Sequence, residues 1–206
     1  GVRILPVALS IAVGSVVGTR LAVTRLGTKA VVFTGLLMLT VAFAWVAVID
    51  VDVPYLQVAA QMVLLGGGLG LTTAPATDSI MGVVRPEQAG AGSAVNDATR
   101  QIGGTLGVAV VGSIFSTLYI RNLTDSQILQ ATPEAAQTTA REGLAQGLQV
   151  AAQSPASIAE AVRDSVSDAF MSGLHAGCLT AAAVCLIGAL FVLAFLPAHP
   201  AKTGPA

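Results

Sequence analysis

The sequence predicts an all-α, multi-pass transmembrane helical bundle. Hydrophobic residues make up 54% of the 206 residues, charged residues make up 10%, and the mean hydropathy is +0.78. Soluble domains carry about a quarter charged residues, more than twice this share. The chain also contains five long apolar segments, and a helix needs about 20 such residues to cross a bilayer. None of them alternates in polarity as the strands of a membrane β-barrel do, so spanning helices are favoured.

The five apolar segments define the expected elements along the chain. The first is short and begins close to Gly1, where no initiator Met is present, so we expect the chain to be a piece of a longer protein. The predicted elements are four spans in residues 1–118 (4–19, 30–49, 55–81 and 92–118), a loop at 119–169, a fifth span at 170–196 and a tail at 197–206.

The charges between the segments predict the orientation of the bundle. The first connection is purely basic, whereas the second is acidic and contains Asp50 and Asp52. Basic loops stay in the cytoplasm, so we expect the first connection and the tail inside the cell and the 119–169 loop outside. Five crossings that start outside and end inside satisfy every loop. The basic residues that set this orientation are Arg20, Arg25, Lys29 and, in the tail, Lys202.

The long loop has helical features of its own. Thr132-Pro133 and Ser154-Pro155 each resemble an N-cap followed by proline at the first helical position. Ile158, Val162, Val166 and Phe170 then recur at about the helical period. We expect one or two short amphipathic helices, the second leading into the last span. They serve either as a solvated connector or as a lid over the extracellular mouth.

Small residues recur four positions apart in the apolar segments. Gly66 and Gly70 form such a pair in the third segment, and Gly103 and Gly107 form one in the fourth. In lipid these pairs let two helices approach closely. The same smooth faces would also let helices slide during a conformational change, and the sequence does not separate packing from sliding.

Seven polar or charged side chains are the candidate site residues. Gln61, Thr72 and Thr73 lie deepest in the third segment, where they either line a cavity or donate hydrogen bonds between helices. The other four lie where the third segment ends and the fourth begins, and an ionisable group in such a position is a functional hypothesis. They are Asp78, Asn96, Asp97 and Arg100.

These charges are expected at the cytoplasmic ends of two adjacent helices. Asp97 and Arg100 lie within two turns of the start of the fourth segment, so they act either as interfacial anchors or as part of a cytoplasmic gate. Asp78 ends the preceding segment and could pair with Arg100. Asn96, Arg100, Gly103 and Gly107 fall on one helix face.

Several function classes are disfavoured. Gly66–Gly70 reads GGGLG, but it lies within an apolar helix and lacks the GK[ST] of a phosphate-binding loop. His175 has no partner at a catalytic spacing, no metal-ligand cluster is apparent, and the two cysteines are expected to pack as small apolar residues. The net charge of −1 argues against nucleic-acid binding. We therefore expect neither an enzyme nor a metal protein.

The chain resembles a transporter family over nearly its whole length. The stretches that carry the resemblance are GLGLTTAPATDSIMG at 68–82 and RPEQAGAGSAVNDATRQIGGTLGVAVVG at 85–112, with ILPVALSIAVGSVVGTRLAVTRLGTK at 4–29 upstream and DAFMSGLHAGCLTAAAVCLIGALFVLAFLP at 168–197 downstream. They are similar to the C-terminal half of the major facilitator superfamily, in its fourteen-helix drug/proton antiporter type (EmrB/QacA-like).

This resemblance implies a function. The five helices would be the last five of fourteen, in a cell membrane protein whose C-terminus is cytoplasmic. The family exports small amphipathic compounds by alternating access, driven by the proton gradient and without a cofactor. The implied partners are the lipid bilayer, the N-terminal helices of the same transporter and the substrate, and the isolated chain would be inactive. The alternatives are a non-transporting membrane subunit or channel, and a soluble helical interaction protein.

Overall fold

The computed structural model describes residues 2–21, 26–50 and 53–196, and every regular element within these ranges is helical. The long elements coincide with apolar sequence, and the α-helices of ten residues or fewer lie in the more polar loop. The helices are η1 (Val2–Ile4), α1 (Leu5–Leu21), α2 (Gly27–Val46), α3 (Tyr55–Met81), η3 (Pro86–Gln88), α4 (Ala89–Asp125), α5 (Gln127–Gln130), α6 (Glu134–Arg141), α7 (Leu144–Gln153) and α8 (Ala159–Phe195).

Within the described ranges, four helical segments are long and apolar enough to cross a membrane. They are Gly27–Val46, Tyr55–Met81, Pro86–Asp125 and Ala159–Phe195. The first apolar helix, Leu5–Leu21, has 17 residues and is shorter than these. The all-helical class and a membrane location are therefore supported. The fifth span remains a prediction, because α1 lies at the lower end of the length that a bilayer requires.

Two long helices extend beyond the ranges that the sequence indicated. α4 continues to Asp125 rather than ending at residue 118, and α8 begins at Ala159 rather than at residue 170. The extension of α8 follows from Val162 and Val166, which lie one turn apart and are both fully buried. Because these side chains pack in a core, the stretch before the last apolar segment is the first part of the same helix.

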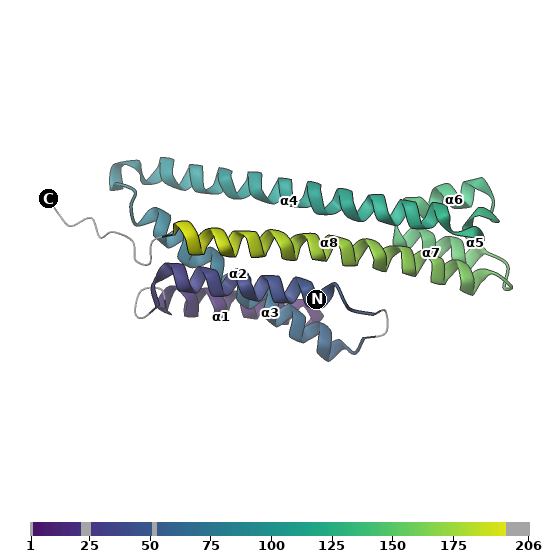
Figure 1. Ribbon diagram of the computed structural model, residues 1–206, viewed down its shortest axis with the longest axis horizontal. Coiled ribbons are helices and arrows are strands. Elements are labelled where there is room, and N and C mark those ends of the chain that lie inside the picture. Colours follow the sequence, from purple (N-terminus) through teal and green to yellow (C-terminus); the bar gives the residue numbers. More distant parts are fainter. Residues whose placement is uncertain (1, 22–25, 51–52, 197–206) are drawn as a thin grey trace. The chain divides into compact units, whose positions relative to one another are not determined.

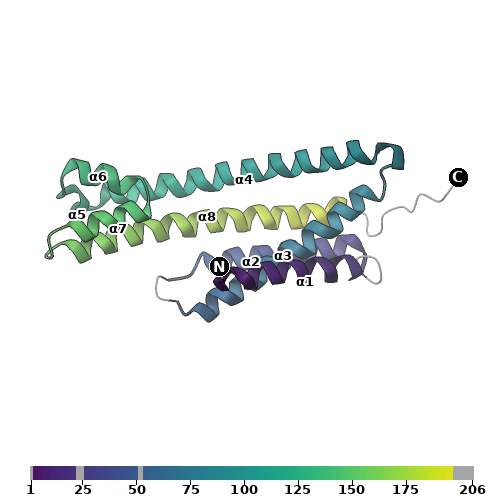
Figure 2. The same cartoon turned by 180° about the vertical axis from the view of Figure 1, so that it is seen from behind.

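The described residues divide into two compact units. The first comprises Gly1–Val46, Val53–Gly107 and Leu179–Ala206. In it α3 packs along both α1 and α2, whereas α1 and α2 have few contacts with each other (Figure 1 and Figure 2). α3 is therefore the helix that holds this group together.

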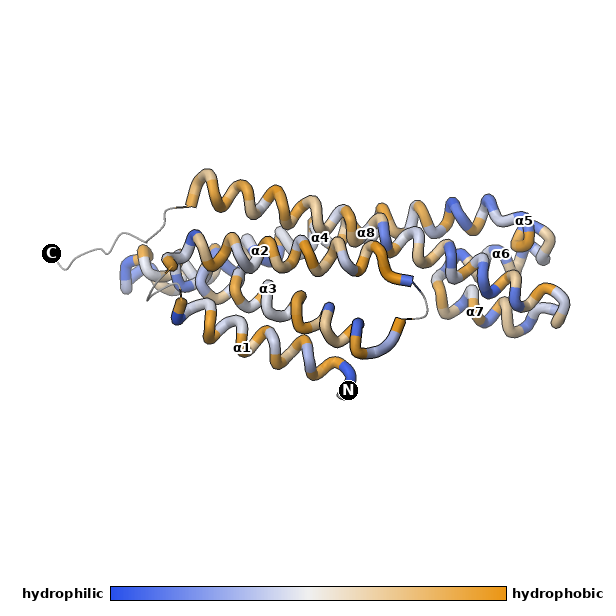
Figure 3. Tube along the Cα trace, turned by 60° about the horizontal axis from the view of Figure 1, so that its bottom comes forward, coloured by the Kyte–Doolittle hydropathy of each residue, from blue (hydrophilic) through white to orange (hydrophobic). Residues whose placement is uncertain are grey.

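The second unit comprises Ala47–Asp52 and Val108–Cys178 and contains a helical cap, which we define as residues 119–169. In Figure 3, hydrophilic residues gather along α5, α6 and α7, whereas α1 to α3 are mostly hydrophobic. The cap nevertheless has its own core, so it is more than a solvated connector. This core consists of Tyr119, Leu123, Leu129, Ala140, Val150, Ala151, Val162, Val166 and Ala169.

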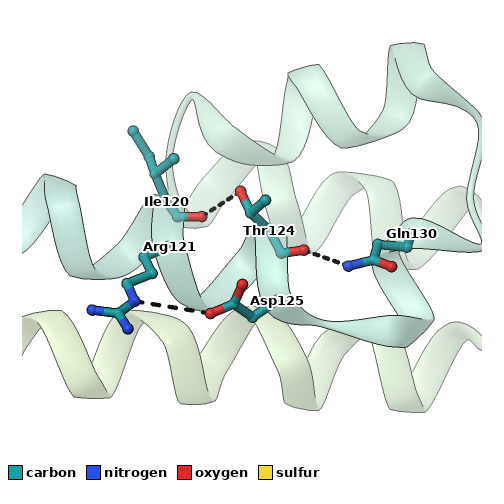
Figure 4. A network of polar contacts seen from close by, with 5 residues as sticks. All are labelled: Ile120, Arg121, Thr124, Asp125 and Gln130. Atoms are coloured by element: carbon teal, nitrogen blue, oxygen red, sulfur yellow. Dashed lines mark hydrogen bonds and ion pairs between the residues drawn. The ribbon is translucent and has the colours of Figure 1, made fainter.

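Polar side-chain contacts stabilise the last turns of α4 within the cap. The Gln130 side-chain Nε2 donates to the backbone oxygen of Thr124 at 2.7 Å, which satisfies a carbonyl in the last turn of the helix (Figure 4). The Thr124 hydroxyl donates to the Ile120 oxygen at 2.8 Å, and Arg121 Nε lies 3.9 Å from Asp125 Oδ2. Because Arg121 and Asp125 are both largely exposed, their ion pair contributes little to stability.

Candidate functional site

The glycines of α3 let α1 approach at backbone distance. A Cβ built on Gly66 would lie 2.5 Å from the oxygen of Val7, and one on Gly70 would lie 2.5 Å from the oxygen of Ile11. Both positions are buried. Carbon and oxygen atoms do not approach this closely, so no side chain fits at either position without separating the helices. The predicted packing role of Gly66 and Gly70 therefore has a specific partner in α1.

Gly68, which lies between Gly66 and Gly70 in the sequence, is directed toward α2. A Cβ on Gly68 would lie 2.8 Å from the oxygen of Gly35, and one on Gly35 would contact both the Gly68 oxygen and the Thr72 hydroxyl. The run from Gly66 to Gly70 thus serves two helix interfaces, with alternate glycines turned toward different neighbours. This arrangement uses the glycines for contact between backbones and leaves no opening for a phosphate.

Among the candidates in α3, Gln61 is buried, and its side-chain amide nitrogen has no described acceptor. Its exposed fraction is 4%, and its side-chain Nε2 has no hydrogen-bond partner among the described residues. It lies seven residues before Gly68, on the side of α3 that faces α2. An unsatisfied amide in an apolar interface is costly, so Gln61 is a donor available to a water molecule or to another group within the bundle.

The two threonine candidates have different surroundings. The Thr72 hydroxyl donates to the Gly68 oxygen at 2.8 Å and lies against Gly35. Thr73 is half-buried, and its backbone oxygen accepts the Thr77 hydroxyl at 3.0 Å. Thr72 therefore belongs to the α2–α3 interface. The cavity-lining role proposed for the two threonines stays a prediction.

The charged candidates are exposed and do not pair. Asp78, Asp97 and Arg100 are all exposed, and Asn96 is half-buried. Among the described residues, no ion pair joins Asp78 to Arg100 or Asp97 to Arg100. The structure thus places these groups near the end of α3 and the start of α4, where the sequence put them. The proposed latch between Asp78 and Arg100 stays a prediction.

The glycines of α4 differ from those of α3. A Cβ built on Gly103 or Gly107 would meet no atom within 4 Å among the described residues. On a helical projection, Asp97, Arg100 and both glycines share one side of α4, with Ile102 on the opposite side. The first half of α4 therefore carries a polar, small-residue face that is mostly exposed, as is the apolar side around Ile102. We call it the open face of α4 and define it by Ser93, Asn96, Asp97, Arg100, Gly103, Gly104 and Gly107.

Two further contacts were not predicted from the sequence. The His175 Nε2 lies 2.8 Å from the backbone oxygen of Ile49, although no partner spacing was evident for this histidine. The buried Tyr119 hydroxyl donates to the Ala140 oxygen at 2.9 Å. Both partners are backbone carbonyls distant in sequence, so no local motif could have revealed them. Neither contact creates a nucleophile or a general base in a cleft.

Metal-ligating side chains do not cluster in the described part of the chain. Within residues 2–21, 26–50 and 53–196, no group of three or more His, Cys, Asp or Glu side chains could hold a metal ion. The arrangement instead provides close helix packing around α3, an open polar face on α4 and a folded cap.

The chain is similar to known proteins named for drug efflux and export. It is 31% identical over 172 residues to the multidrug efflux pump LfrA of Mycolicibacterium smegmatis, a match that covers 83% of this chain and 33% of the relative. It is 26% identical over 212 residues to the multidrug transporter protein MdtP of Bacillus subtilis, covering 96% and 39%.

A third relative, the tetracenomycin C resistance and export protein of Streptomyces glaucescens, is 26% identical over 210 residues, covering 100% of this chain and 39% of the relative. No family model matches the chain. The chain spans between 33% and 39% of the length of these three relatives. Their names point to efflux and drug resistance, and the membrane-length helices agree with a transport protein of the membrane.

Proposed function

We propose that the chain is the C-terminal portion of a proton-coupled transporter that exports small amphipathic compounds by alternating access. The observation that carries this proposal is the match of 83% to 100% of the chain to relatives named as efflux or export proteins. Those relatives are much longer, so the complete activity belongs to a larger bundle. The proton gradient would supply the energy, and no cofactor is required.

The open face of α4 supports a larger bundle. Charged side chains in membrane helices almost always face the bundle interior or a water-filled cavity. Asp97 and Arg100 are exposed, and the neighbouring Gly103 and Gly107 touch no described residue. In the proposed transporter, this face either packs against the N-terminal helices of the same protein or lines the path that the substrate takes. Lipid then covers the opposite, apolar side around Ile102.

The charge pattern supports the proposed orientation. The basic connection between α1 and α2 and the basic tail would lie in the cytoplasm, which places the cap outside the cell membrane. Asp78 and Arg100 would then lie toward the cytoplasmic side, where they act as a gate or as interfacial anchors. Substrate contacts would lie deeper, near Gln61 or Thr72, where transporters of this mechanism hold their substrates.

Ethidium efflux from cells that lack their own drug pumps tests the proposal. We expect cells that express the complete reading frame around this chain to expel ethidium, and a proton ionophore to stop the efflux. Cells that express the 206-residue chain alone should retain ethidium, although the chain is present in the membrane. Ionophore-resistant efflux would exclude proton coupling, and efflux by the isolated chain would exclude the need for further helices.

A matched pair of double variants tests the role of α4. Gly103→Leu with Gly107→Leu adds bulk to the open face, and Ala98→Leu with Ala109→Leu adds bulk to the opposite side. In the complete protein, we expect the glycine pair to abolish efflux and the alanine pair to retain it. Equal efflux from both, at equal protein levels in the membrane, would show that the open face does not contact the rest of a transporter.

A further inference from the structure

The cap contains a groove that the proposed transport function does not require. It lies between α6 and α7, and its lining includes the turns around Thr132-Pro133 and Ser154-Pro155. Its volume is about 570 Å³, within the range of about 300–1,000 Å³ that is usual for small-molecule sites. The groove is therefore large enough for a ligand with one or two aromatic rings.

The groove is framed by residues with restricted backbones. Pro133 is the N-cap residue of α6, and Pro155 directly follows Ser154, the C-cap residue of α7. The Gln137 side-chain Nε2 also donates to the Thr132 oxygen at 2.9 Å, which ties the first turn to α6. Proline fixes its own φ angle, so both ends of the groove are shaped before a ligand arrives.

The lining of the groove is uncharged. No charged side chain is among the described residues that form it, although the cap as a whole carries exposed groups such as Glu134 and Arg163. The apolar part of the lining, which we call its floor, consists of alanine and proline side chains together with Val150 and Ile158. Because an ion would meet no opposite charge among these lining residues, the lining favours an uncharged ligand.

The polar atoms of the groove define the hydrogen bonds that a ligand could make. The hydroxyls of Thr132, Thr139 and Ser154 already donate to backbone oxygens of their own turns, at 2.6, 2.9 and 2.8 Å. Each can therefore only accept a hydrogen bond from a ligand.

Two carboxamides complete the polar lining. Gln149 and Gln153 lie one turn apart on α7, are exposed, and line the groove. A carboxamide both donates and accepts. The groove thus offers several acceptors and two amide groups around an apolar floor, which matches a compound that has a hydroxyl or amide donor on an apolar body.

We propose that this groove is a binding site for small, uncharged, amphipathic compounds. The ligand lays its apolar body on the alanine-rich floor and directs its polar group to Gln149 and Gln153. The site is separate from any contact between the spanning helices. Its occupation does not depend on transport by this chain.

Photolabelling of the whole chain in detergent micelles with 4-(hydroxymethyl)benzophenone tests the proposal. This probe is uncharged, has a hydroxyl donor, and marks the residues that it contacts. After irradiation, we expect mass spectrometry to find saturable labelling within residues 131–158, and diphenylmethanol to compete with it. Labelling spread evenly over the cap and the spanning helices, or insensitive to the competitor, would overturn the proposal.

Charged relatives of the probe test the predicted ligand class. We expect 4-benzoylbenzoate and (4-benzoylbenzyl)trimethylammonium to label residues 131–158 far less than the neutral probe at equal concentration. A cation or an anion that labels these residues as strongly as the neutral probe would refute the assignment to uncharged compounds.

Variants locate the site on α7. The double variant Gln149→Glu with Gln153→Glu should lower labelling within residues 131–158 by about tenfold, because the added carboxylates must lose water against an apolar ligand. Gln127→Glu is the matched control, since this exposed residue lies in the cap but does not line the groove. Equal labelling in the double variant and this control would refute the site.

A second variant keeps the test valid if the double variant fails to fold. Ala135→Phe fills the groove from an exposed position and leaves the core of the cap unchanged. It should abolish competed labelling while the circular dichroism spectrum stays that of the unaltered chain. Full labelling in this folded variant would refute the proposal independently.

Discussion

The Nε2 of His175 in α8 lies 2.8 Å from the backbone oxygen of Ile49, which follows α2. A carbonyl oxygen can only accept, so Nε2 carries the proton of this hydrogen bond. The contact ties a segment between α2 and α3 to a helix 126 residues later in the chain. The segment Ala47–Asp52 groups with the second unit, which also contains His175.

His175→Ala should destabilise the second unit. The Ile49 oxygen would lose its donor in a residue that is only 9% exposed, and a buried unsatisfied group costs about 1–3 kcal/mol. Thermal unfolding in detergent micelles should show a lower midpoint for this variant. His175→Gln keeps a side-chain donor and should recover part of the loss. An alanine variant that melts with the unaltered chain would contradict the importance of the contact.

Gly66→Ala and Gly70→Ala should each destabilise the first unit. The new methyl group would press on the backbone of α1, and overpacking of this kind costs typically 1–3 kcal/mol. Gly103→Ala and Gly107→Ala are the matched controls, because their added carbons meet nothing within 4 Å. We expect the controls to melt no lower than the unaltered chain. Alanine favours a helix more than glycine does, so equal losses at all four positions would show that contact with α1 does not govern the result.

Tyr119→Phe should weaken the cap. The change removes the hydroxyl that donates to the Ala140 oxygen at 2.9 Å, in a residue that is 3% exposed, and such a loss costs about 1–3 kcal/mol. Hydrogen exchange should become faster in α6. Tyr55→Phe is the control, because it removes a hydrogen bond to the Arg3 oxygen at an exposed position. It should change hydrogen exchange around its own bond less than Tyr119→Phe changes exchange in α6. Unchanged exchange in α6 would contradict this role for Tyr119.

The pairing of Asp78 with Arg100 is tested by exchanging their charges in the complete protein. If they form a latch in one transport state, Asp78→Arg and Arg100→Asp should each impair ethidium efflux, and the double variant should recover it. Exposed Asp97 provides the control, since Asp97→Arg combined with Arg100→Asp should not recover efflux. A double Asp78/Arg100 exchange that is no better than the single variants would refute the latch.

The helical class and the packing role of the two glycines in α3 could be predicted, because they follow from local composition and spacing. Gly66 and Gly70 have the same spacing as Gly103 and Gly107, yet only the first pair has a described neighbour. Spacing identifies a face of a helix but does not identify what covers it.

The cap illustrates what the sequence could not reveal. The N-cap and proline signals marked the breaks at Pro133 and Pro155 but misassigned their caps. Pro133 is itself the N-cap of α6, whereas Ser154 is the C-cap of α7 and the long helix α8 begins only at Ala159. The cap core depends on contacts such as that of Tyr119 with Ala140, whose partner is a backbone atom. The groove arises from two turns and two helices that meet only in the folded cap. No partner was predicted for His175 for the same reason, since its partner is the backbone oxygen of a residue that is distant in sequence.

The central position of α3 has a consequence for how the chain is made. α1 and α2 leave the ribosome before α3, yet they have few contacts with each other, and both pack on this later helix. Until α3 has been synthesised, α1 and α2 therefore lack the helix that joins them. A ribosome that stalls before residue 81 leaves these two helices unassembled.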